Sequence, residues 1–412
     1  MATNTNFNRI YWAITAFGVA EEGTSDATKE RADGTDYGNP RDAVYIRGVQ
    51  SVGITTNFNL EQVFQLGQLA VYEDVEEVPD IEVSVERVLD GVTYHDVVQE
   101  GNGPNNSAAP PPNINTMHCH LLYGHVTQLH ASSIPTMQNN KCDVYLSLNR
   151  DSDSNAGDGK PDAYVYCSGM YVSSASWTFA TDGNVTESIT LVGNHKVWTT
   201  NSGSRIGENL GHADHEPMIG GVQGGGGANP GDVDDSDATK VSDNLALPSG
   251  TTELMTGDVM RRQNVKFISK PTIFDANTQI TSCTVSVDFG REQINVLGKK
   301  LPYYRYVSYP VEVSSEWEIL ARGDEGLNAY PERNNVTTDD TIRIQTVNDD
   351  GVVCADWYLG TKNKCTSVSY GGGTTGGENV TYSYSFRNFN DLIVATTGAL
   401  IPTSVNGIGP AA

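Results

Sequence analysis

The residues best suited to holding a metal ion lie in the segment RDSDSNAGDGKPD, residues 150–162. Its oxygen-bearing side chains have a spacing that a calcium-binding loop uses: Asp151, Asp153, Asn155 and Asp162. However, Ala156 stands where an EF-hand loop requires glycine, and the flanking sequence does not predict helices. We interpret this segment, Asp151–Asp162, as the polar tip of a hairpin that needs no metal, with calcium binding as the open alternative.

A second group of possible metal ligands lies in MHCHLLYGHVTQLH: His118, Cys119, His120, His125 and His130. On a β-strand, His118 and His120 would share one face and could begin a zinc site. The remaining spacings match no standard zinc motif, and clustered histidines in β-proteins are more often surface residues. We therefore predict no metal site.

Arrangements typical of catalysis are not found. The sequence HADHE, His212–Glu216, is not the HExxH zinc motif, and GGVQGGGG neither follows a predicted strand nor opens a predicted helix, as a phosphate-binding loop would. No serine or cysteine stands in a nucleophile elbow. We expect a protein that is not an enzyme and uses no cofactor.

Charge and composition limit the partners. Among 412 residues, 26 are Lys or Arg and 51 are Asp or Glu, which gives a formal charge of −25. This balance disfavours nucleic-acid binding by phosphate neutralisation, because such binding needs clustered cations. It favours solubility, or a surface to which a polyanion does not adhere. We also expect no membrane partner, because no apolar stretch approaches the length of a membrane span.

The six cysteines lie far apart without a CxxC pair, so we predict buried thiols, and a Cys354–Cys365 disulfide is the less favoured alternative. The first residues, MATNTNFNRIYWAITAFGVA, lack the basic and apolar regions of a signal peptide. Synthesis and assembly in a cytoplasm are therefore expected.

Alternation of apolar and polar residues dominates the chain and predicts an all-β protein. Strand patterns cover residues 80–89, 143–149, 163–169, 186–193, 281–289, 311–320, 341–347 and 380–386. Helical periodicity is short, and only LEQVFQLG and DLIVATTG could each form a turn or two. A Pro/Asn-rich loop, Glu100–Thr116, and a Gly/Asp-rich segment, Asn201–Ser249, interrupt these patterns.

One long segment occurs twice. NFNLEQVFQLGQLAVYEDVEEVP, Asn57–Pro79, aligns without a gap with DFGREQINVLGKKLPYYRYVSYP, Asp288–Pro310, at an offset of 231 residues (288 − 57). The next residues also match, IEVS at Ile81–Ser84 with VEVS at Val311–Ser314. Later, GNVTES matches ENVTYS at an offset of 195 (379 − 184).

We infer two copies of one β-domain. The predicted division is an N-terminal arm with the first strands at 1–50, a first domain at 51–200, a Gly/Asp-rich linker or insertion at 201–260 and a second domain at 261–412.

In each copy, the strand that follows the proline has two different faces. In the second copy Val313, Ser315 and Trp317 alternate with Glu312, Ser314, Glu316 and Glu318, and in the first copy Ile81, Val83 and Val85 alternate with Glu82, Ser84 and Glu86. Because buried glutamates are costly, the Glu-bearing faces should meet water. An ordinary solvated face would give the same pattern.

These two segments resemble the tail-tube proteins of long-tailed bacteriophages. The resemblance consists of a strand, a Phe-led loop ending at Leu-Gly (Phe58 to Leu66-Gly67, and Phe289 to Leu297-Gly298), and a proline that opens an alternating strand. It implies tandem β-barrel or β-sandwich domains with short helices, whose sheets join those of their neighbours into a ring. Rings stack into a tube that conducts DNA into the host, and a duplicated chain would need only three copies for a pseudo-hexameric ring.

The resemblance also implies roles for residues. The Glu-bearing faces would line an acidic lumen through which DNA passes without specific binding: Glu82, Ser84, Glu86, Glu312, Ser314, Glu316 and Glu318. The long loops would contact the neighbouring ring: Leu60, Val63, Phe64, Leu66 and Tyr72 in the first copy, and Ile294, Leu297, Tyr303 and Tyr304 in the second. The expected partners are further copies of the chain and the sheath, baseplate and terminator proteins of a virion tail.

Two other functions stay open. A baseplate hub or tail terminator also uses tube domains. A β-sandwich module that binds a receptor or glycan would predict exposed aromatic residues on loops, and LPYYRYVSYP, Leu301–Pro310, could serve that purpose. The duplication argues against the binding module, because the equivalent loop in the first copy is acidic and carries one tyrosine.

Overall fold

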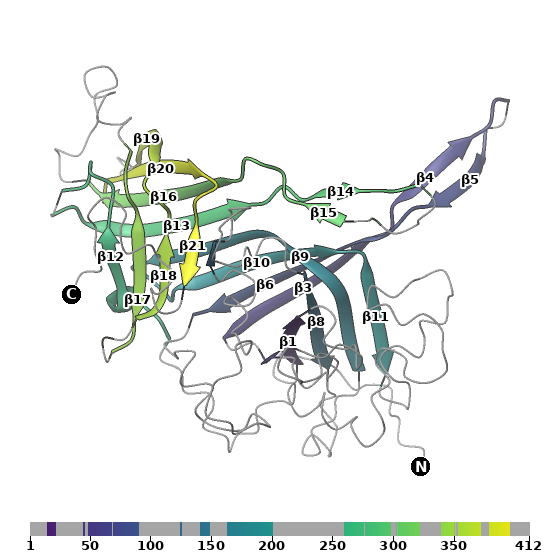
Figure 1. Cartoon of the computed structure of the whole chain (residues 1–412), viewed down its shortest axis with the longest axis horizontal. Coiled ribbons are helices and arrows are strands. Elements are labelled where there is room, and N and C mark those ends of the chain that lie inside the picture. Colours follow the sequence, from purple (N-terminus) through teal and green to yellow (C-terminus); the bar gives the residue numbers. More distant parts are fainter. Residues whose placement is uncertain are drawn as a thin grey trace, which may run out of the picture.

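The computed structural model of this chain is almost entirely β-structure (Figure 1). It describes residues 15–21, 44–45, 48–67, 69–89, 124–125, 141–148, 163–200, 259–275, 277–297, 302, 304–321, 339–349, 351, 353–371 and 379–395. In this part of the chain the only helix is one 3₁₀ turn, η4 (Arg262–Asn264), and no helix is long and apolar enough to cross a membrane.

Eight antiparallel strands form the continuous part of a large sheet. In spatial order they are β19 (Lys364–Gly371), β20 (Thr381–Phe389), β16 (Glu312–Leu320), β13 (Ile280–Asp288), β9 (Ala163–Ala180), β10 (Thr186–Gly193), β6 (Asp80–Val88) and β3 (Val49–Asn57). The predicted alternation is confirmed in β6 and β16, whose apolar residues are buried and whose Glu82, Glu86, Glu312 and Glu316 are exposed.

Each half of the chain also contributes a smaller set of strands. In the first half β1 (Thr15–Glu21) pairs with β2 (Val44–Tyr45) and β8 (Lys141–Leu148), and β8 and β11 (His195–Thr200) pair with the first part of β9. Four strands of the second half, β12 (Val265–Ser269), β17 (Arg343–Val347), β18 (Val353–Tyr358) and β21 (Ile393–Ala395), form a five-stranded sheet with β7 (Gly124–His125) of the first half, which pairs with β21.

These two sets of strands are structurally equivalent, and we call them unit 1 (β1, β3, β6, β8, β9, β10, β11) and unit 2 (β12, β13, β16–β21). In unit 2, β18 and β19 take the place of the two parts of the long strand β9. The large sheet therefore contains the same strand order twice, β9-β10-β6-β3 and β19-β20-β16-β13. The predicted domain boundaries stay a prediction, and residues 201–258 lie outside the described part of the chain.

The positions of β-bulges show which residue of unit 1 corresponds to which residue of unit 2. Gln50 is the extra residue where β3 pairs with β6, and Thr281 is the extra residue where β13 pairs with β16, so the offset is 281 − 50 = 231. In the same way, Ser173 bulges out of β9 and Thr366 out of β19, an offset of 366 − 173 = 193. A bulge interrupts the ladder at one defined residue, so two coincident bulges are strong markers of a common register.

The same ladders correct one sequence match. Asp80 pairs with Asn57 and Glu312 pairs with Asp288, so β6 corresponds to β16 at an offset of 312 − 80 = 232. The IEVS/VEVS match had an offset of 311 − 81 = 230. A slip of two residues keeps every side chain on its face, because the strand period is two, so the predicted faces were unaffected.

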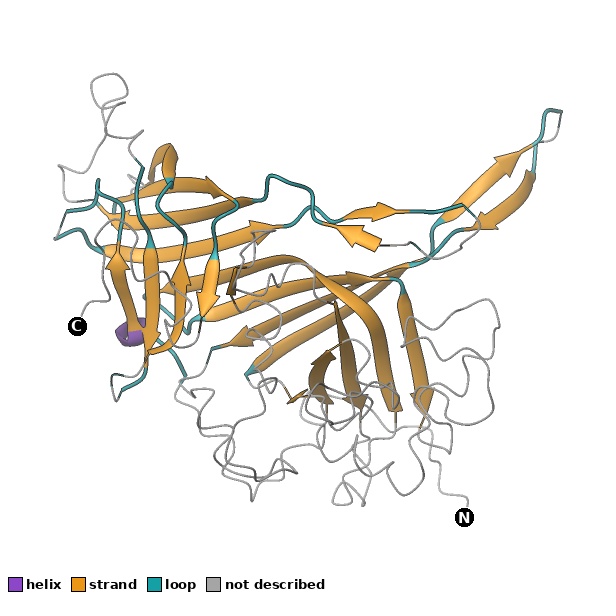
Figure 2. Ribbon diagram, viewed as in Figure 1, coloured by secondary structure: helices purple, strands orange, loops and turns teal. Residues whose placement is uncertain are grey.

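In unit 2 the five-stranded sheet lies across the large sheet (Figure 2). The hydrophobic core contains residues of both units, including Phe17, Val144 and Val165 in unit 1 and Ile344 and Trp357 in unit 2. Trp177 and Phe179 of unit 1 pack edge-on against Trp357 of unit 2, with ring centroids 6.2 and 5.1 Å apart. The indole Nε1 of Trp177 donates to the Glu187 carboxylate at 2.8 Å, and Arg87 forms a buried ion pair with the same carboxylate. Aromatic rings supply much of the buried area that holds the two units together.

Both predicted helical turns were wrong. Leu60–Phe64 is strand β4, paired with β5 (Val71–Glu76), and β21 occupies Ile393–Ala395. In the second copy β14 (Glu292–Ile294) pairs with β15 (Tyr304–Tyr306). Both long loops are thus β-hairpins that extend beyond the sheet, and we call Phe58–Pro79 arm 1 and Phe289–Pro310 arm 2 (Figure 1). The sheets do not close into a barrel within one chain.

Candidate functional site: a polar face, two free edges and two arms

The face of the large sheet opposite the core, which we call the polar face, is lined by hydroxyl and carboxylate groups. Residues that lie directly opposite one another across six strands form one row of it: Glu86, Ser188, Ser176, Ser286, Ser314 and Arg387. The Ser286 and Ser314 hydroxyls are 2.7 Å apart, and the Ser282 hydroxyl donates to Glu318 at 3.2 Å. Such a face offers hydrogen bonds without a deep apolar or cationic site.

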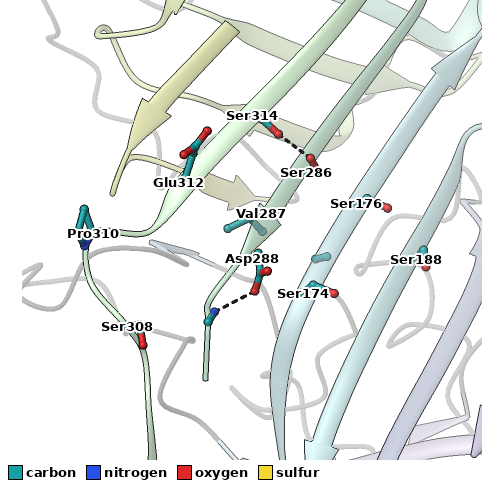
Figure 3. A pocket seen from close by; sticks show the side chains of 12 residues that line it. Ser174, Ser176, Ser188, Ser286, Val287, Asp288, Ser308, Pro310, Glu312 and Ser314 are labelled. Atoms are coloured by element: carbon teal, nitrogen blue, oxygen red, sulfur yellow. Dashed lines mark hydrogen bonds between the residues drawn. The ribbon is translucent and has the colours of Figure 1, made fainter. Parts of the chain in front are cut away.

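Near the bases of the arms the polar face is hollowed into a depression of about 560 Å³ (Figure 3). Serines from β9, β10, β13 and β16 line it, with Asp288 and Glu312 at its edge. Acidic residues on the polar face of the described strands outnumber the cations Arg387 and Lys364: Glu82, Glu86, Asp288, Glu312, Glu316 and Glu318. All seven residues assigned to the lumen lie on this face, and their role stays a prediction.

The two units are joined edge to edge by β13 and β9. Ser282–Asp288 pair with Ala180–Ser174, and the ladder continues at Phe289, whose backbone N–H donates to the Ser173 carbonyl at 2.9 Å. The apolar side chains that this joint directs into the core are buried: Ala175, Trp177, Phe179, Cys283, Val285, Val287 and Phe289. We call this the internal joint. It shows how the β13-type edge of one unit binds the β9-type edge of another.

The two strands at the ends of the large sheet, β3 and β19, are the counterparts of β13 and β9. In β3, Val52 and Ile54 are half-buried where their counterparts Cys283 and Val285 are buried, and in β19, Val368 and Tyr370 are exposed where Ala175 and Trp177 are buried. Tyr370, the counterpart of Trp177, is 61% exposed, against 0% for Trp177. Phe58, the counterpart of Phe289, is 70% exposed, against 0%. An unpaired strand edge with exposed aromatic groups is a surface that another strand can complete.

Arm 1 projects from the sheet, and its apolar side chains are exposed. Leu66 at its tip is fully accessible, and the other residues predicted to contact a neighbour are exposed as well: Leu60, Val63, Phe64 and Tyr72. Fully exposed leucines on a slender hairpin are unfavourable in water unless another surface covers them.

Arm 2 lies against unit 1 at its base. Arg305 forms an ion pair with Asp80 and also donates to the Asn194 side chain at 3.2 Å. The Tyr304 ring packs edge-on against Tyr171 with centroids 5.3 Å apart, and Arg291 Nε donates to the Val172 carbonyl at 2.7 Å. Desolvation by burial lowers the pKa of Arg291 to about 10. Ile294 and Leu297, farther along the arm, are exposed, whereas Tyr303 lies outside the described residues.

The candidate metal ligands fall largely outside the structure described. Asp151–Asp162, His118–His120, His130 and His212–Glu216 are not among the described residues, and of His125 only the backbone in β7 is described. Within the described residues no group of three or more His, Cys, Asp or Glu side chains could hold a metal ion. Cys354 and Cys365 are thiols and do not form a disulfide, and burial raises the pKa of Cys283.

Reasoning from the sequence missed the internal joint and the two free edges. The alternating pattern of β9 indicates a strand but does not indicate which strand lies beside it. The signal that could have located the edges is the repeat itself, because Phe58 and Phe289 occupy equal positions and only one of them is covered by its own chain.

No family model and no curated protein matches this chain. Comparison with solved structures finds a likeness to a chain of the anti-feeding prophage baseplate, with 17% identity over 32% of this chain and 90% of that chain and a TM-score of 0.23. A chain of the anti-feeding prophage tube-terminating cap shows 16% identity over 27% of this chain and 75% of that chain, with a TM-score of 0.21.

Proposed function

We propose that this protein is a structural subunit of a phage-type tail tube, in which copies join edge to edge into rings that stack around a DNA conduit. The observation that carries the proposal is the internal joint. Unit 2 presents its β13 edge to the β9 edge of unit 1, and among the described strands β3 and β19 leave one unpaired edge of each type. The same contact can therefore be made again between chains.

The internal joint supplies the register of the contact between chains. Ser286 pairs with Ser176 inside the chain. In β3 the counterpart of Ser286 is residue 286 − 231 = 55, and in β19 the counterpart of Ser176 is residue 176 + 193 = 369. Thr55 of one copy should therefore face Ser369 of the next copy. By the same arithmetic Ile54 faces Tyr370, and Phe58 is covered as Phe289 is.

A contact between two different edges is heterologous, so it produces either a closed ring or an open filament. Because the joint inside the chain and the joint between chains would have the same geometry, units are related by one repeated rotation. Three chains would then supply the six units of a pseudo-hexameric ring. Closure also removes both exposed edges, which are otherwise an aggregation hazard.

The polar face suits the wall of a conduit. The five-stranded sheet and the core cover the other face of the large sheet, so the Ser- and Glu-bearing face remains available to a lumen. Its carboxylates repel phosphate, and its few cations offer little counterion release, so a duplex would pass without binding. The proposal assigns the chain to the same kind of assembly as the anti-feeding prophage baseplate and tube-terminating cap.

Cysteine cross-linking tests the proposal directly. Directly opposed residues in antiparallel strands have Cα atoms about 4.5–5.5 Å apart, within the range of a disulfide. A chain carrying Thr55→Cys and Ser369→Cys should form covalent dimers and trimers on oxidation and stop at the trimer. The matched control is Thr55→Cys with Val368→Cys, whose side chains would lie on opposite faces and should not cross-link.

Two outcomes would overturn the proposal. Absence of cross-links between chains, or equal cross-linking of the control pair, would exclude this edge contact. A ladder that continues past the trimer would exclude a ring of three chains. End-on electron micrographs of the same sample should show rings or tubes with six lobes around a lumen.

A further inference from the structure

The two arms, which are otherwise equivalent, carry opposite charge. Arm 1 contains five acidic residues (Glu61, Glu73, Asp74, Glu76, Glu77) and no Lys or Arg. Arm 2 contains four basic residues (Arg291, Lys299, Lys300, Arg305) and one acidic residue, Glu292. Their formal charges are thus −5 and 4 − 1 = +3. A solvated loop needs no such contrast, so the difference indicates that the arms meet different surfaces.

The surface that arm 2 meets is visible within the chain. Arg305 at its base pairs with Asp80 of β6 and with Asn194, and Tyr304 packs on Tyr171 of β9. These contacts lie beside the internal joint, where arm 2 crosses β9 and β10 to reach the start of β6 (Figure 1).

The two strands of arm 1 pair in the same register as those of arm 2, so each arm 2 contact residue has a counterpart in arm 1. Gln62 pairs with Asp74 as Gln293 pairs with Arg305, so Asp74 takes the place of Arg305 and Glu73 takes the place of Tyr304 (each pair differs by 231). The side chains of Glu73 and Asp74 are exposed.

The corresponding surface of unit 2 carries two cations, Lys364 and Arg387, in positions that are uncharged in unit 1. Lys364 takes the place of Tyr171 (364 − 171 = 193), and Phe389 takes the place of Asn194 (389 − 194 = 195). The Arg387 guanidinium lies over the Phe389 ring, 5.6 Å from its centroid. Acidic groups close by are Glu312, which takes the place of Asp80, and Asp339, which contacts Lys364 at 3.5 Å while both side chains are half-exposed.

We propose that the base of arm 1 docks on the β19–β20 corner of a second copy of this chain, with Glu73 and Asp74 against Lys364 and Arg387. The docking rests on the proposed ring. It places arm 1 as arm 2 is placed inside the chain, but with a different pair of side chains: Tyr304 against Tyr171 inside the chain corresponds to Glu73 against Lys364 between chains. Arm 1 therefore fits unit 2 of a neighbour, and arm 2 fits unit 1.

The residue that distinguishes the two joints is Lys364, which takes the place of Tyr171. If arm 1 approached unit 1, Glu73 would lie against Tyr171 and would lose this opposite charge, whereas the acid near Asp74 is present at both joints, as Asp80 or as Glu312. Units must then alternate around the ring, which keeps an incoming chain in the correct order. The tip of arm 1, with Leu66, extends past these contacts and remains available to a neighbouring ring.

Charge reversal tests the docking. We expect Glu73→Lys or Lys364→Glu alone to weaken ring formation roughly tenfold at low salt, and the double variant to recover most of the loss, since exposed pairs contribute up to about 1 kcal/mol and reversal adds repulsion. Sedimentation over a range of concentrations and salt measures the association. The matched control is Glu61→Lys, with the same charge change on the same arm; its counterpart Glu292 is exposed on arm 2.

The Thr55→Cys/Ser369→Cys cross-link separates the failure of this inference from failure of the ring. If the cross-link forms and the single reversals match Glu61→Lys, the arm does not dock on Lys364 and Arg387, and the edge contact stands. If the double variant associates no better than the single variants, the pairing of Glu73 with Lys364 is refuted. If the cross-link itself is absent, the ring and the docking both fail.

Discussion

Phe58 is exposed and Phe289 is buried at equivalent positions of the two units, so the same substitution to alanine should affect assembly at the first position and stability of the fold at the second. Phe289→Ala removes a fully buried ring and should lower the free energy of unfolding by about 3–5 kcal/mol. Phe58→Ala removes a ring that is 70% exposed in the isolated chain, so the unfolding free energy should change by less than about 0.5 kcal/mol.

The effect of Phe58→Ala should instead be seen in assembly. A phenylalanine ring buries roughly 200 Å², so covering the exposed 70% removes about 140 Å² from water. At about 25 cal/mol per Å², this area contributes about 3.5 kcal/mol to each joint between chains, a loss of roughly two orders of magnitude in association on substitution.

Two measurements separate the effects. Urea unfolding of dilute chain gives the stability of the fold, and sedimentation at increasing concentration gives association. We expect Phe289→Ala to shift the first and Phe58→Ala to shift only the second. If Phe58→Ala assembles like the unchanged chain, or unfolds as readily as Phe289→Ala, the equivalence of the two joints is refuted.

Three further predictions concern the core, a buried acid and the polar face. Glu187→Ala leaves Arg87 buried without its carboxylate and should cost about 3–5 kcal/mol in urea unfolding; a loss no larger than that of Glu86→Ala, on the exposed face, would contradict the role of this pair. Desolvation raises the pKa of Asp391 from 3.8 to about 6, so the folded state binds its proton more tightly than the unfolded state, and this residue's contribution to stability should fall as pH rises from about 4 to 6, by up to about 3 kcal/mol. Asp391→Asn should remove that slope, and an unchanged pH profile would exclude Asp391 as its source. Glu312→Lys with Glu316→Lys should leave rings intact and slow DNA passage in assembled particles, and unimpaired DNA delivery would place this face outside the conduit.

Much of the fold follows from the sequence because burial has period two in a strand. Ile81, Val83 and Val85 were predicted to share a face, and their burial confirms it. The same periodicity cannot distinguish registers that differ by two residues, which is why Ile81 was aligned with Val311 although the ladders align it with Val313.

The arms could not be predicted as hairpins for a physical reason. Leu60, Val63 and Phe64 have the spacing of an amphipathic helix, which assumes a core of the same chain to pack against. In the structure all three are exposed on β4. Under the proposed function these side chains contact a neighbouring copy, and spacing alone does not distinguish such a contact from an internal core.

The free edges could not be predicted because pairing between distant strands depends on three-dimensional placement. β19 was not among the strands predicted from the sequence, and nothing local in KCTSVSYG indicates that one of its sides has no neighbour among the described strands. Tyr370 becomes informative only when the ladders identify it as the counterpart of Trp177.

The presence of Tyr370 where unit 1 has Trp177 also explains how the same edge contact can use different residues inside the chain and between chains. The internal joint is made once, when the chain folds, so Trp177 and Phe289 are never required to face water in the folded state. The joint between chains must exist in an open form before assembly, and Tyr370 keeps an aromatic ring there while adding a hydroxyl that water can solvate. Duplication permits Trp at one joint and Tyr at the other. If the two units were identical, one residue would have to serve both the permanently buried joint and the joint that is open before assembly. Duplication likewise permits the opposite charges of the arms, since each arm can then be matched to the single surface it meets.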